Sequence, residues 1–171
     1  MKHLILLLSI LSVSLVSAQA YKGKGDNKFQ VGANLQDGGT GINVSYDFGA
    51  GENISFGFSS TYLLSVDNAL LENPNKALNA DFDDRFDIRA RFNANLGNVI
   101  NIDENFDLYP GLSLGLKNFG GHLGARYFFT EGFGVYTELN VPFAKYKTDD
   151  LNRAETLHNQ FTVNIGASFN L

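Results

Sequence analysis

The sequence predicts an all-β fold: an eight-stranded, antiparallel, up-and-down transmembrane β-barrel, preceded by a cleaved signal peptide. Three observations predict this fold. Apolar residues alternate with small or polar residues over eight stretches, and a period of two residues is the signal of a β-strand. The polar face is rich in glycine, serine, asparagine and charge, which suits a crowded lumen better than a solvated sheet surface. The last stretch, FTVNIGASFNL, alternates in the same way, so we expect it to close the sheet against the first.

The N-terminus reads as a secretory signal peptide. MKHLILLLSILSVSLVSA has a short charged start, an apolar run and a small-residue end, which predicts cleavage before Gln19 or else after Ala20. No later stretch approaches the roughly 18 consecutive apolar residues of a transmembrane helix. We therefore expect a signal peptide over residues 1–18, a short N-terminal segment over 19–27 and the barrel over 28–171.

Charge and cysteine content exclude several classes of protein. The chain has 13 Lys and Arg against 18 Asp and Glu, a formal net charge of −5, which argues against a nucleic-acid partner. It has no cysteine, and this excludes a disulfide scaffold, a thiolate metal site and a lipid-modified N-terminal cysteine.

The predicted strands are residues 28–36, 40–48, 53–63, 85–97, 106–117, 122–130, 133–147 and 161–171. Each is long enough to cross the hydrocarbon layer, which takes about 9–11 residues of tilted strand. Pro110 and Pro142 each remove a ladder donor, and we expect both near strand ends, where a bulge or an unpaired edge absorbs them. The apolar face is carried, strand by strand, by Phe29, Val31, Ala33 and Leu35; Ile42, Val44, Tyr46 and Phe48; Ile54, Phe56, Phe58 and Tyr62; Phe86, Ile88, Ala90, Phe92, Ala94 and Leu96; Leu108, Leu112, Leu114 and Leu116; Leu123, Ala125, Tyr127 and Phe129; Val135, Leu139, Val141 and Phe143; and Phe161, Val163, Ile165, Ala167, Phe169 and Leu171.

The connections between these strands fall into two sets. Residues 49–52, 98–105 and 130–132 are predicted to be turns on the periplasmic side. The outer loops are predicted at 37–39, 64–84, 118–121 and 148–157, and two of them are long and polar, as in outer-membrane barrels.

The polar face predicts a cluster of charges in the lumen. An eight-stranded barrel has a lumen just wide enough for side chains to fill, and buried charges need partners. We expect Arg126 to lie within cross-strand reach of Glu138. The favoured interpretation is a structural plug of ion pairs, and the alternative is a gated narrow pore. The predicted lumen cluster is Arg89, Arg91, Arg126, Glu138 and Asp47, joined by Asp107 and Lys117.

The long second outer loop supplies the candidates for interaction with a surface partner, because loops on rigid scaffolds carry such sites. Its acidic residues, together with Asp67, raise the alternative of a calcium site, although their spacing matches no calcium loop and favours a solvated acidic loop. The loop candidates are Leu70, Leu71, Asp81, Asp83 and Asp84.

No catalytic motif accompanies the histidines, so the sequence predicts no enzyme, no cofactor and no metal site. His3 leaves with the signal peptide, and His122 and His158 are expected to begin strands at the outer rim. Nothing resembles the nucleophile motif GxSxG.

Three stretches resemble small outer-membrane β-barrel proteins of the outer-membrane protein X and A type, in particular porin-like proteins of Bacteroidetes-type bacteria. They are the signal end VSAQ, GLSLGLKNFGGHLGARYFFTEGFGVYTELNV (111–141) and the terminal FTVNIGASFNL. The resemblance implies the outer membrane of a Gram-negative bacterium, contact with lipid and lipopolysaccharide, and insertion by the barrel assembly machinery. That machinery recognises a last strand usually ending in an aromatic residue, whereas here Leu171 is last and Phe169 stands two before it. Because the sequence stops at the predicted barrel, we expect no peptidoglycan-binding domain after it.

Three functions remain open from the sequence. The first is a structural or surface-interaction role through the extracellular loops, with a lumen plugged by polar side chains. The second is a narrow channel for ions or small solutes. The third is a soluble periplasmic, lipocalin-like barrel with its apolar face inward around an apolar ligand.

Overall fold

The computed structural model describes residues 19–67, 72–73, 76–77, 80–149 and 154–171. The predicted signal peptide lies outside these residues. Eight long strands form a closed barrel, within which all neighbouring strands that pair are antiparallel. The strands are β1 (Asn27–Gln36), β2 (Gly39–Gly49), β3 (Ile54–Val66), β6 (Phe86–Ala94), β7 (Phe106–Gly115), β8 (Asn118–Phe128), β9 (Phe133–Lys145) and β10 (Thr162–Asn170).

The barrel closes as the sequence predicts, between its first and last strands. Around the barrel the order is β1-β10-β9-β8-β7-β6-β3-β2, and β1 pairs with β10 from Lys28–Asn170 to Gln36–Thr162. Gly32 faces Gly166 in the middle of this seam. A Cβ on Gly32 would lie 2.3 Å from the Ile165 carbonyl oxygen, so the two backbones approach more closely here than a side chain would allow.

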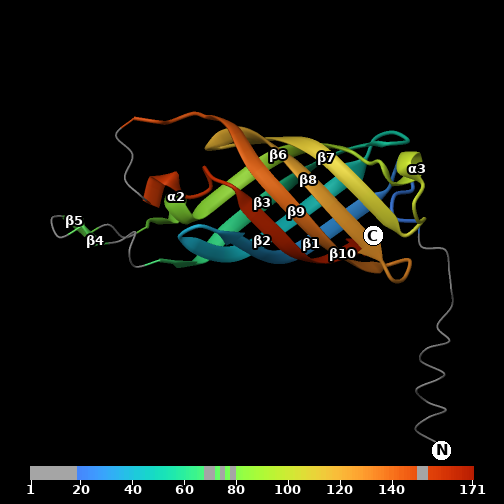
Figure 1. Cartoon of the computed structure of the whole chain (residues 1–171), viewed down its shortest axis with the longest axis horizontal. Helices are drawn as coiled ribbons and strands as arrows, with labels where there is room; N and C mark the ends of the chain where they lie inside the picture. The colour runs from blue at the N-terminus through green and yellow to red at the C-terminus, as the bar shows by residue number, and fades with distance from the viewer. Residues whose placement is uncertain (1–18, 68–71, 74–75, 78–79, 150–153) are drawn as a thin grey trace, which may run out of the picture.

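The connections distinguish the two ends of the barrel (Figure 1). The end that we name the loop end has the connections 37–38, 67–85, 116–117 and 146–161, and it holds α2 (Phe82–Arg85), η2 (Ala154–Thr156) and the two-residue strands β4 (Glu72–Asn73) and β5 (Lys76–Ala77). The opposite end, which we name the turn end, has the connections 50–53, 95–105 and 129–132, and it holds α3 (Gly97–Ile100) and the C-terminus. The two long loops of the prediction therefore lie at the same end of the barrel, together with two short connections.

One predicted loop is wrong. Residues 118–121 belong to β8, and the connection between β7 and β8 shrinks to residues 116–117. The Asn and Gly residues that predicted a turn instead lie within the strand, where they allow close packing. Asn118 is fully buried in the lumen, and the ring of Phe143 covers the Gly121 position, where a Cβ would meet it at 2.4 Å.

Both prolines are accommodated by interrupted ladders. Pro110 lies in the middle of β7 rather than near its end, and the ladder between β6 and β7 stops at the Asn93–Gly111 pair, one residue before it. Pro142 pairs with Gly120 where the register between β8 and β9 shifts, so a bulge adjoins this proline, as predicted.

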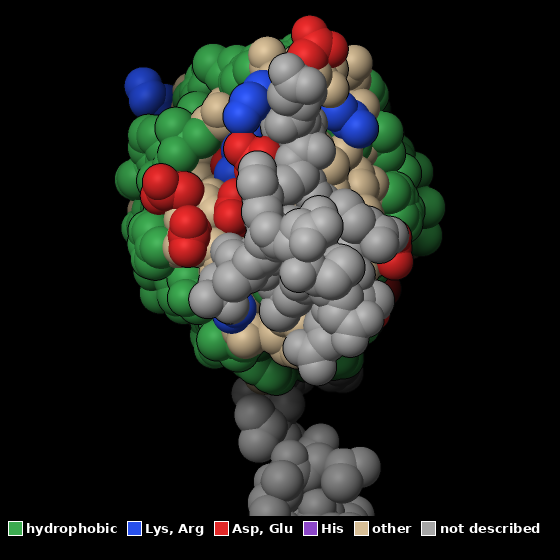
Figure 2. Space-filling model, turned by 90° about the vertical axis from the view of Figure 1, so that its left-hand side faces the viewer, with side chains coloured by type: hydrophobic (Ala, Val, Ile, Leu, Met, Phe, Trp, Pro, Cys, Tyr) green, Lys and Arg blue, Asp and Glu red, His purple; other side chains and the backbone are tan. Residues whose placement is uncertain are grey.

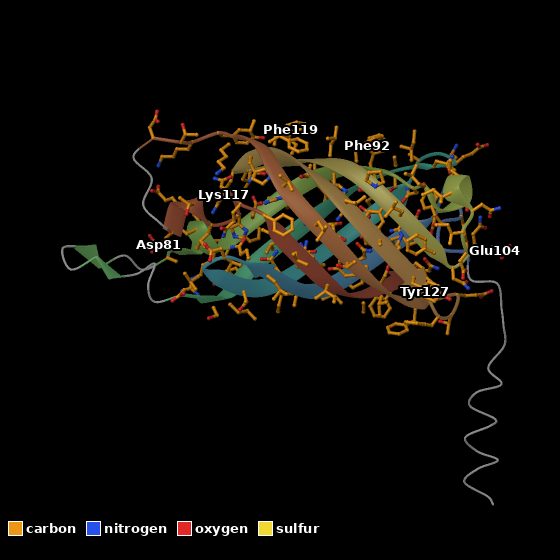
Figure 3. All side chains as sticks on the ribbon, in the orientation of Figure 1. Asp81, Phe92, Glu104, Lys117, Phe119 and Tyr127 are labelled. Carbon is orange, nitrogen blue, oxygen red and sulfur yellow. The ribbon has the colours of Figure 1, made fainter. Side chains whose placement is uncertain are left out.

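The two faces of the sheet are arranged inside out relative to a soluble sandwich. Large apolar side chains cover the outer wall, where Phe56 is 53% exposed and Phe58 is 59% exposed. Figure 2 shows hydrophobic side chains around the outline of the loop end, and Figure 3 shows Phe92 and Phe119 pointing away from the barrel. The lumen instead buries polar groups such as Gln30, Asn93 and Asp107. This is the arrangement that a hydrocarbon environment requires of a closed sheet.

Within the described residues, no helix has both the length and the apolar character to cross a membrane.

Candidate functional site

The candidate site is the lumen, where inward side chains of all eight strands meet. The alternation places every second residue of a strand in the lumen. The lumen is narrow, so side chains from strands on opposite sides of the barrel contact each other. The polar groups form three layers along the barrel axis, which we name the central, turn-end and loop-end layers.

Arg91 organises the central layer. Its Nη2 donates to Glu138 Oε2 at 2.6 Å, and its Nε lies 3.1 Å from Asp47 Oδ1. His122 joins them, with Nε2 2.7 Å from Asn93 Oδ1 and 3.4 Å from Arg91 Nη2. All five side chains are buried, so one guanidinium bridges two carboxylates from different strands of the wall.

Arg126 organises the turn-end layer. Its Nη2 donates to Asp107 Oδ2 and to Asn95 Oδ1, both at 2.7 Å, and its Nε donates to Asp107 Oδ2 at 3.1 Å. The ring of Tyr109 lies between the two arginines, with centroid distances of 4.6 Å to Arg126 Cζ and 5.8 Å to Arg91 Cζ. The aromatic ring therefore links the two layers by cation–π contacts on a fully buried phenol.

The N-terminal segment closes the turn end. Ala20 and Tyr21 are buried, and the Tyr21 hydroxyl donates to the carbonyl of Ile54 at 2.6 Å. Burial, reinforced by the nearby Asp26 carboxylate, raises the pKa of Tyr21 to about 12. Lys28 pairs with Asp26 and lies under the ring of Phe128, 5.5 Å from its centroid. Residues 19–28 thus form a stopper in the mouth at the turn end.

The loop-end layer closes the other mouth. Arg89 pairs with Asp87 at 2.5 Å and donates to the carbonyl of His158 at 3.1 Å. Asn118 Nδ2 donates to the same carbonyl at 2.9 Å. Below this layer the lumen keeps a cavity of about 10 Å³, close to the space of a single water molecule. The lumen is therefore filled along its length.

The structure brings the predicted lumen residues together, but with different partners. Arg126 lies diagonal to Glu138, because Glu138 is opposite Gly124 and Arg126 is opposite Tyr136, so the predicted cross-strand position is confirmed. The ion pairs are different ones, since Arg126 pairs with Asp107, and Glu138 pairs with Arg91 across the lumen. Arg89 lies apart from the others in the loop-end layer.

Two further predictions about the site need correction. His122 lies within β8 and in the central layer, not at the outer rim. Lys117 lies in the connection after β7, where its Nζ donates to the carbonyl of Asp84 at 3.0 Å, and burial lowers its pKa. It caps the loop end instead of entering the lumen.

Sequence reasoning missed several members of the lumen layers: Lys28, Asp87, Tyr109, His122 and Tyr136. Their alternation was a usable signal, because each stands between two outward residues. Tyr109, for example, lies between Leu108 and Pro110, and it is fully buried. Tyr109 and Tyr136 were assigned to neither face from the sequence, although their positions in the alternation place both in the lumen.

The acidic loop candidates cap the N-terminus of α2 or lie in its first turn. The Asp81 side chain accepts from the backbone of Asp84, and the Asp84 side chain accepts from the backbone of Asp81, which makes a capping box. Asp83 lies in the first turn of the same helix, where a negative charge is favoured. Leu70 and Leu71 lie outside the described residues. Within the described ranges, no three His, Asp or Glu side chains gather closely enough to hold a metal ion.

Aromatic rings form a band around the turn end of the outer wall. Ring centroids lie 6.2 Å apart for Phe29 and Phe169, 5.7 Å for Phe169 and Phe133, and 6.3 Å for Phe133 and Phe129. Tyr127 adjoins Phe129 at 5.5 Å and points outward at this end (Figure 3). The band connects the outer faces of β1, β10, β9 and β8, as an interfacial aromatic belt does.

An apolar groove of about 690 Å³ lies on the same wall, above this band. It is lined by side chains of β8, β9 and β10 such as Ala125, Val135 and Ile165. This groove therefore lies on the apolar exterior of the barrel and not in its lumen.

Two solved structures match this chain. A chain from the work titled "De novo design of transmembrane beta-barrels" matches with a TM-score of 0.55 and 10% identity, over 88% of this chain and 98% of that one. The solution NMR structure of outer membrane protein G from Pseudomonas aeruginosa matches with a TM-score of 0.47 and 10% identity, over 88% of this chain and 99% of that one. The first likeness shows that the fold is that of an eight-stranded transmembrane barrel.

Comparison of the sequence gives the family but no curated relative. No curated protein matches the chain. The model of one protein family covers residues 11–171, which include the whole barrel. On that match, the chain belongs to the family of unknown function DUF6646.

Proposed function

We propose that this protein is an integral outer-membrane β-barrel with a structural or surface-interaction role, and that its lumen is a plug rather than a pathway. One observation carries the proposal. An apolar outer wall surrounds three layers of mutually paired polar side chains, and chain segments fill both mouths. A barrel of this kind presents its loops to the outside and seals the membrane beneath them.

The proposed location is the outer membrane of a Gram-negative bacterium, reached through a signal peptide at residues 1–18. The resemblance to outer-membrane protein X and A-type barrels supports this location, as do the apolar wall and the aromatic band. The proposed partners are membrane lipid, lipopolysaccharide and, during insertion, the barrel assembly machinery. The long loop at 67–85 is the proposed contact for a surface partner, and we assign the protein no enzymatic activity.

The geometry favours the plug over the narrow channel. Arg91, Glu138 and Asp47 meet in mid-lumen, and a pathway for ions would have to break both ion pairs of the central layer. Breaking a buried pair leaves an uncompensated charge, which costs several kcal/mol. The lumen is also unsuited to the lipocalin-like alternative, since most of its described lining is polar or charged.

Conductance measurements separate the plug from the channel. We expect the purified protein, inserted in planar lipid bilayers, to give no unitary currents at neutral pH, because the ion pairs of the central layer block the lumen. The control is Lys147→Ala, which removes one partner of the exposed Lys147–Glu155 pair and should behave identically. Reproducible single-channel currents that disappear in Glu138→Ala would overturn the plug and establish a gated pore.

A further inference from the structure

The segment Ala154–Asn159, between β9 and β10, folds down into the loop end of the barrel. Ala154 and Leu157 are each 1% exposed and pack with Leu63, Val66 and Ala80 in a small apolar cluster. This cluster sits at the rim, above the polar layers. Apolar side chains in the mouth of a polar lumen hold the segment in place, while the rest of the lumen is held by ion pairs.

His158 is the tip of this segment and reaches the polar part of the lumen. It is 2% exposed, its carbonyl accepts from Arg89 and Asn118, and its ring Nε2 lies 2.9 Å from the carbonyl oxygen of Arg85. Its φ of 66° is left-handed, a conformation that a non-glycine residue rarely adopts. The closed position is therefore maintained by specific contacts against the preference of the backbone.

Beneath His158 lies the small cavity of about 10 Å³, which we name the chamber. Asn34, Asn43, Ser59, Asn140 and Asn164 line it together with Arg89, and the His158 ring forms part of its roof. The chamber adjoins the central layer, since Asn164 Nδ2 donates to Glu138 Oε1 at 3.4 Å, and Arg91 and Glu138 block the lumen beyond it. Removing the segment would therefore open a dead-end vestibule and not a pore.

We propose that residues 154–159 are a lid over this chamber and that protonation of His158 releases the lid, exposing an amide- and hydroxyl-lined vestibule at the outer surface. This inference goes beyond the plugged barrel, since the lid closes the outer mouth while the ion pairs of the central layer block the lumen below it.

The charges around His158 explain why protonation would act in this direction. The groups facing it are Asp87 and Arg89 on β6 and Lys117 in the connection after β7, with the Arg85 carbonyl at the end of α2. His158 is therefore near one carboxylate, Asp87, and two cations, and Asp87 already forms an ion pair with Arg89. The carboxylate of the lid itself, Glu155, accepts a hydrogen bond from Lys147. A positive imidazolium gains little from this environment and loses its hydration.

The sign of the pH dependence follows from the same environment. Burial, with the Lys117 and Arg89 charges, lowers the pKa of His158 from 6.5 to about 4 when the lid is closed, although Asp87 opposes the shift. The open lid returns the imidazole to water and to its ordinary pKa. The open form therefore binds the proton more tightly, and closure is fully stable above about pH 6.5 and weakens as the pH falls toward 4.

A cysteine reporter tests the lid directly, because the natural chain has no cysteine. Ser59→Cys places a thiol in the chamber, and Thr148→Cys places a matched thiol on an exposed loop position. Each single variant is labelled with a pyridyl disulfide in detergent micelles, and the labelling rate of the chamber thiol is divided by that of the loop thiol. Linkage between the two pKa values predicts that this ratio rises on the order of 30-fold from about pH 7.5 to about pH 5.

His158→Asn is the key variant, because asparagine tolerates the left-handed φ and does not titrate. In the Ser59→Cys background it should remove the pH dependence of the ratio. Glu131→Gln, at an exposed position of the opposite end, is the control and should keep the dependence. His158→Gln gives the same readout if the asparagine variant fails to fold. A flat ratio in the chain that keeps His158, a rise that persists in both His158 variants or one that vanishes in Glu131→Gln would each overturn the proposal. Conductance at the same pH values separates lid opening from failure of the plug, since the central layer should still block currents.

Discussion

Replacing Asp107 with asparagine should lower the free energy of unfolding of the barrel by about 3–5 kcal/mol. Arg126 and Asp107 are both fully buried, and Asp107 supplies the carboxylate for two of the donors of the guanidinium. The substitution keeps the shape and an oxygen acceptor but leaves the Arg126 charge without its counter-charge. Urea titration in lipid vesicles, followed by the mobility difference between folded and unfolded protein on a gel, gives the change in free energy.

The matched control is Glu155→Gln, which removes the carboxylate of an exposed ion pair. Glu155 and Lys147 are 2.9 Å apart at the loop end, and their side chains are 30% and 64% exposed. Solvent screens such a pair, so the expected loss is below about 1 kcal/mol. Equal effects of the two substitutions would contradict the account, because they would mean that the lumen pair is as solvated as the surface pair.

Replacing Leu139 with arginine should lower the stability of the barrel in a bilayer by about 2–4 kcal/mol. Leu139 is the middle residue of the 13-residue β9, and its outward side chain is 39% exposed. In a membrane this position lies near the midplane, where a charged side chain has no water. The change is measured by the same urea titration in vesicles.

Phe133→Arg provides the depth control within the same strand. Phe133 is the first residue of β9, belongs to the aromatic band and is 44% exposed, so it lies at the membrane interface with similar exposure. The arginine there can reach water, and the expected loss falls to about 0–1 kcal/mol. Similar losses at the two positions would argue that the wall faces water and not hydrocarbon.

The sequence predicted the barrel well because its signal is local. Alternation acts on neighbouring residues, so strand existence, the outward set from Phe29 to Leu35 and the closing of β1 on β10 all followed from the period of two. The prediction of a loop at 118–121 was wrong because Asn and Gly occur both in turns and at crowded positions inside strands. Composition alone does not distinguish a turn from an inward amide beside a bulge.

The pairing of the lumen charges could not be read from the sequence for a different reason. Cross-strand neighbours on the wall follow from hairpin register, and they suggested Arg126 with Glu138. Contacts across the lumen depend on the tilt and stagger of all eight strands. This geometry places Arg91 of β6 beside Glu138 of β9, although the two strands are not neighbours in the sheet. The stopper around Tyr21 and the lid around His158 have no periodicity, so only tertiary packing reveals them.

The most direct test of the account is to express the full chain in a Gram-negative host, isolate the outer-membrane fraction and compare boiled with unboiled samples on a denaturing gel. A closed barrel in lipid should be recovered in that fraction and should change its mobility only after boiling, because the backbone groups of its wall are paired within the sheet. A protein released by osmotic shock, with the same mobility before and after boiling, would contradict a membrane barrel and would place the apolar wall of Phe56, Phe58 and Leu139 against something other than lipid.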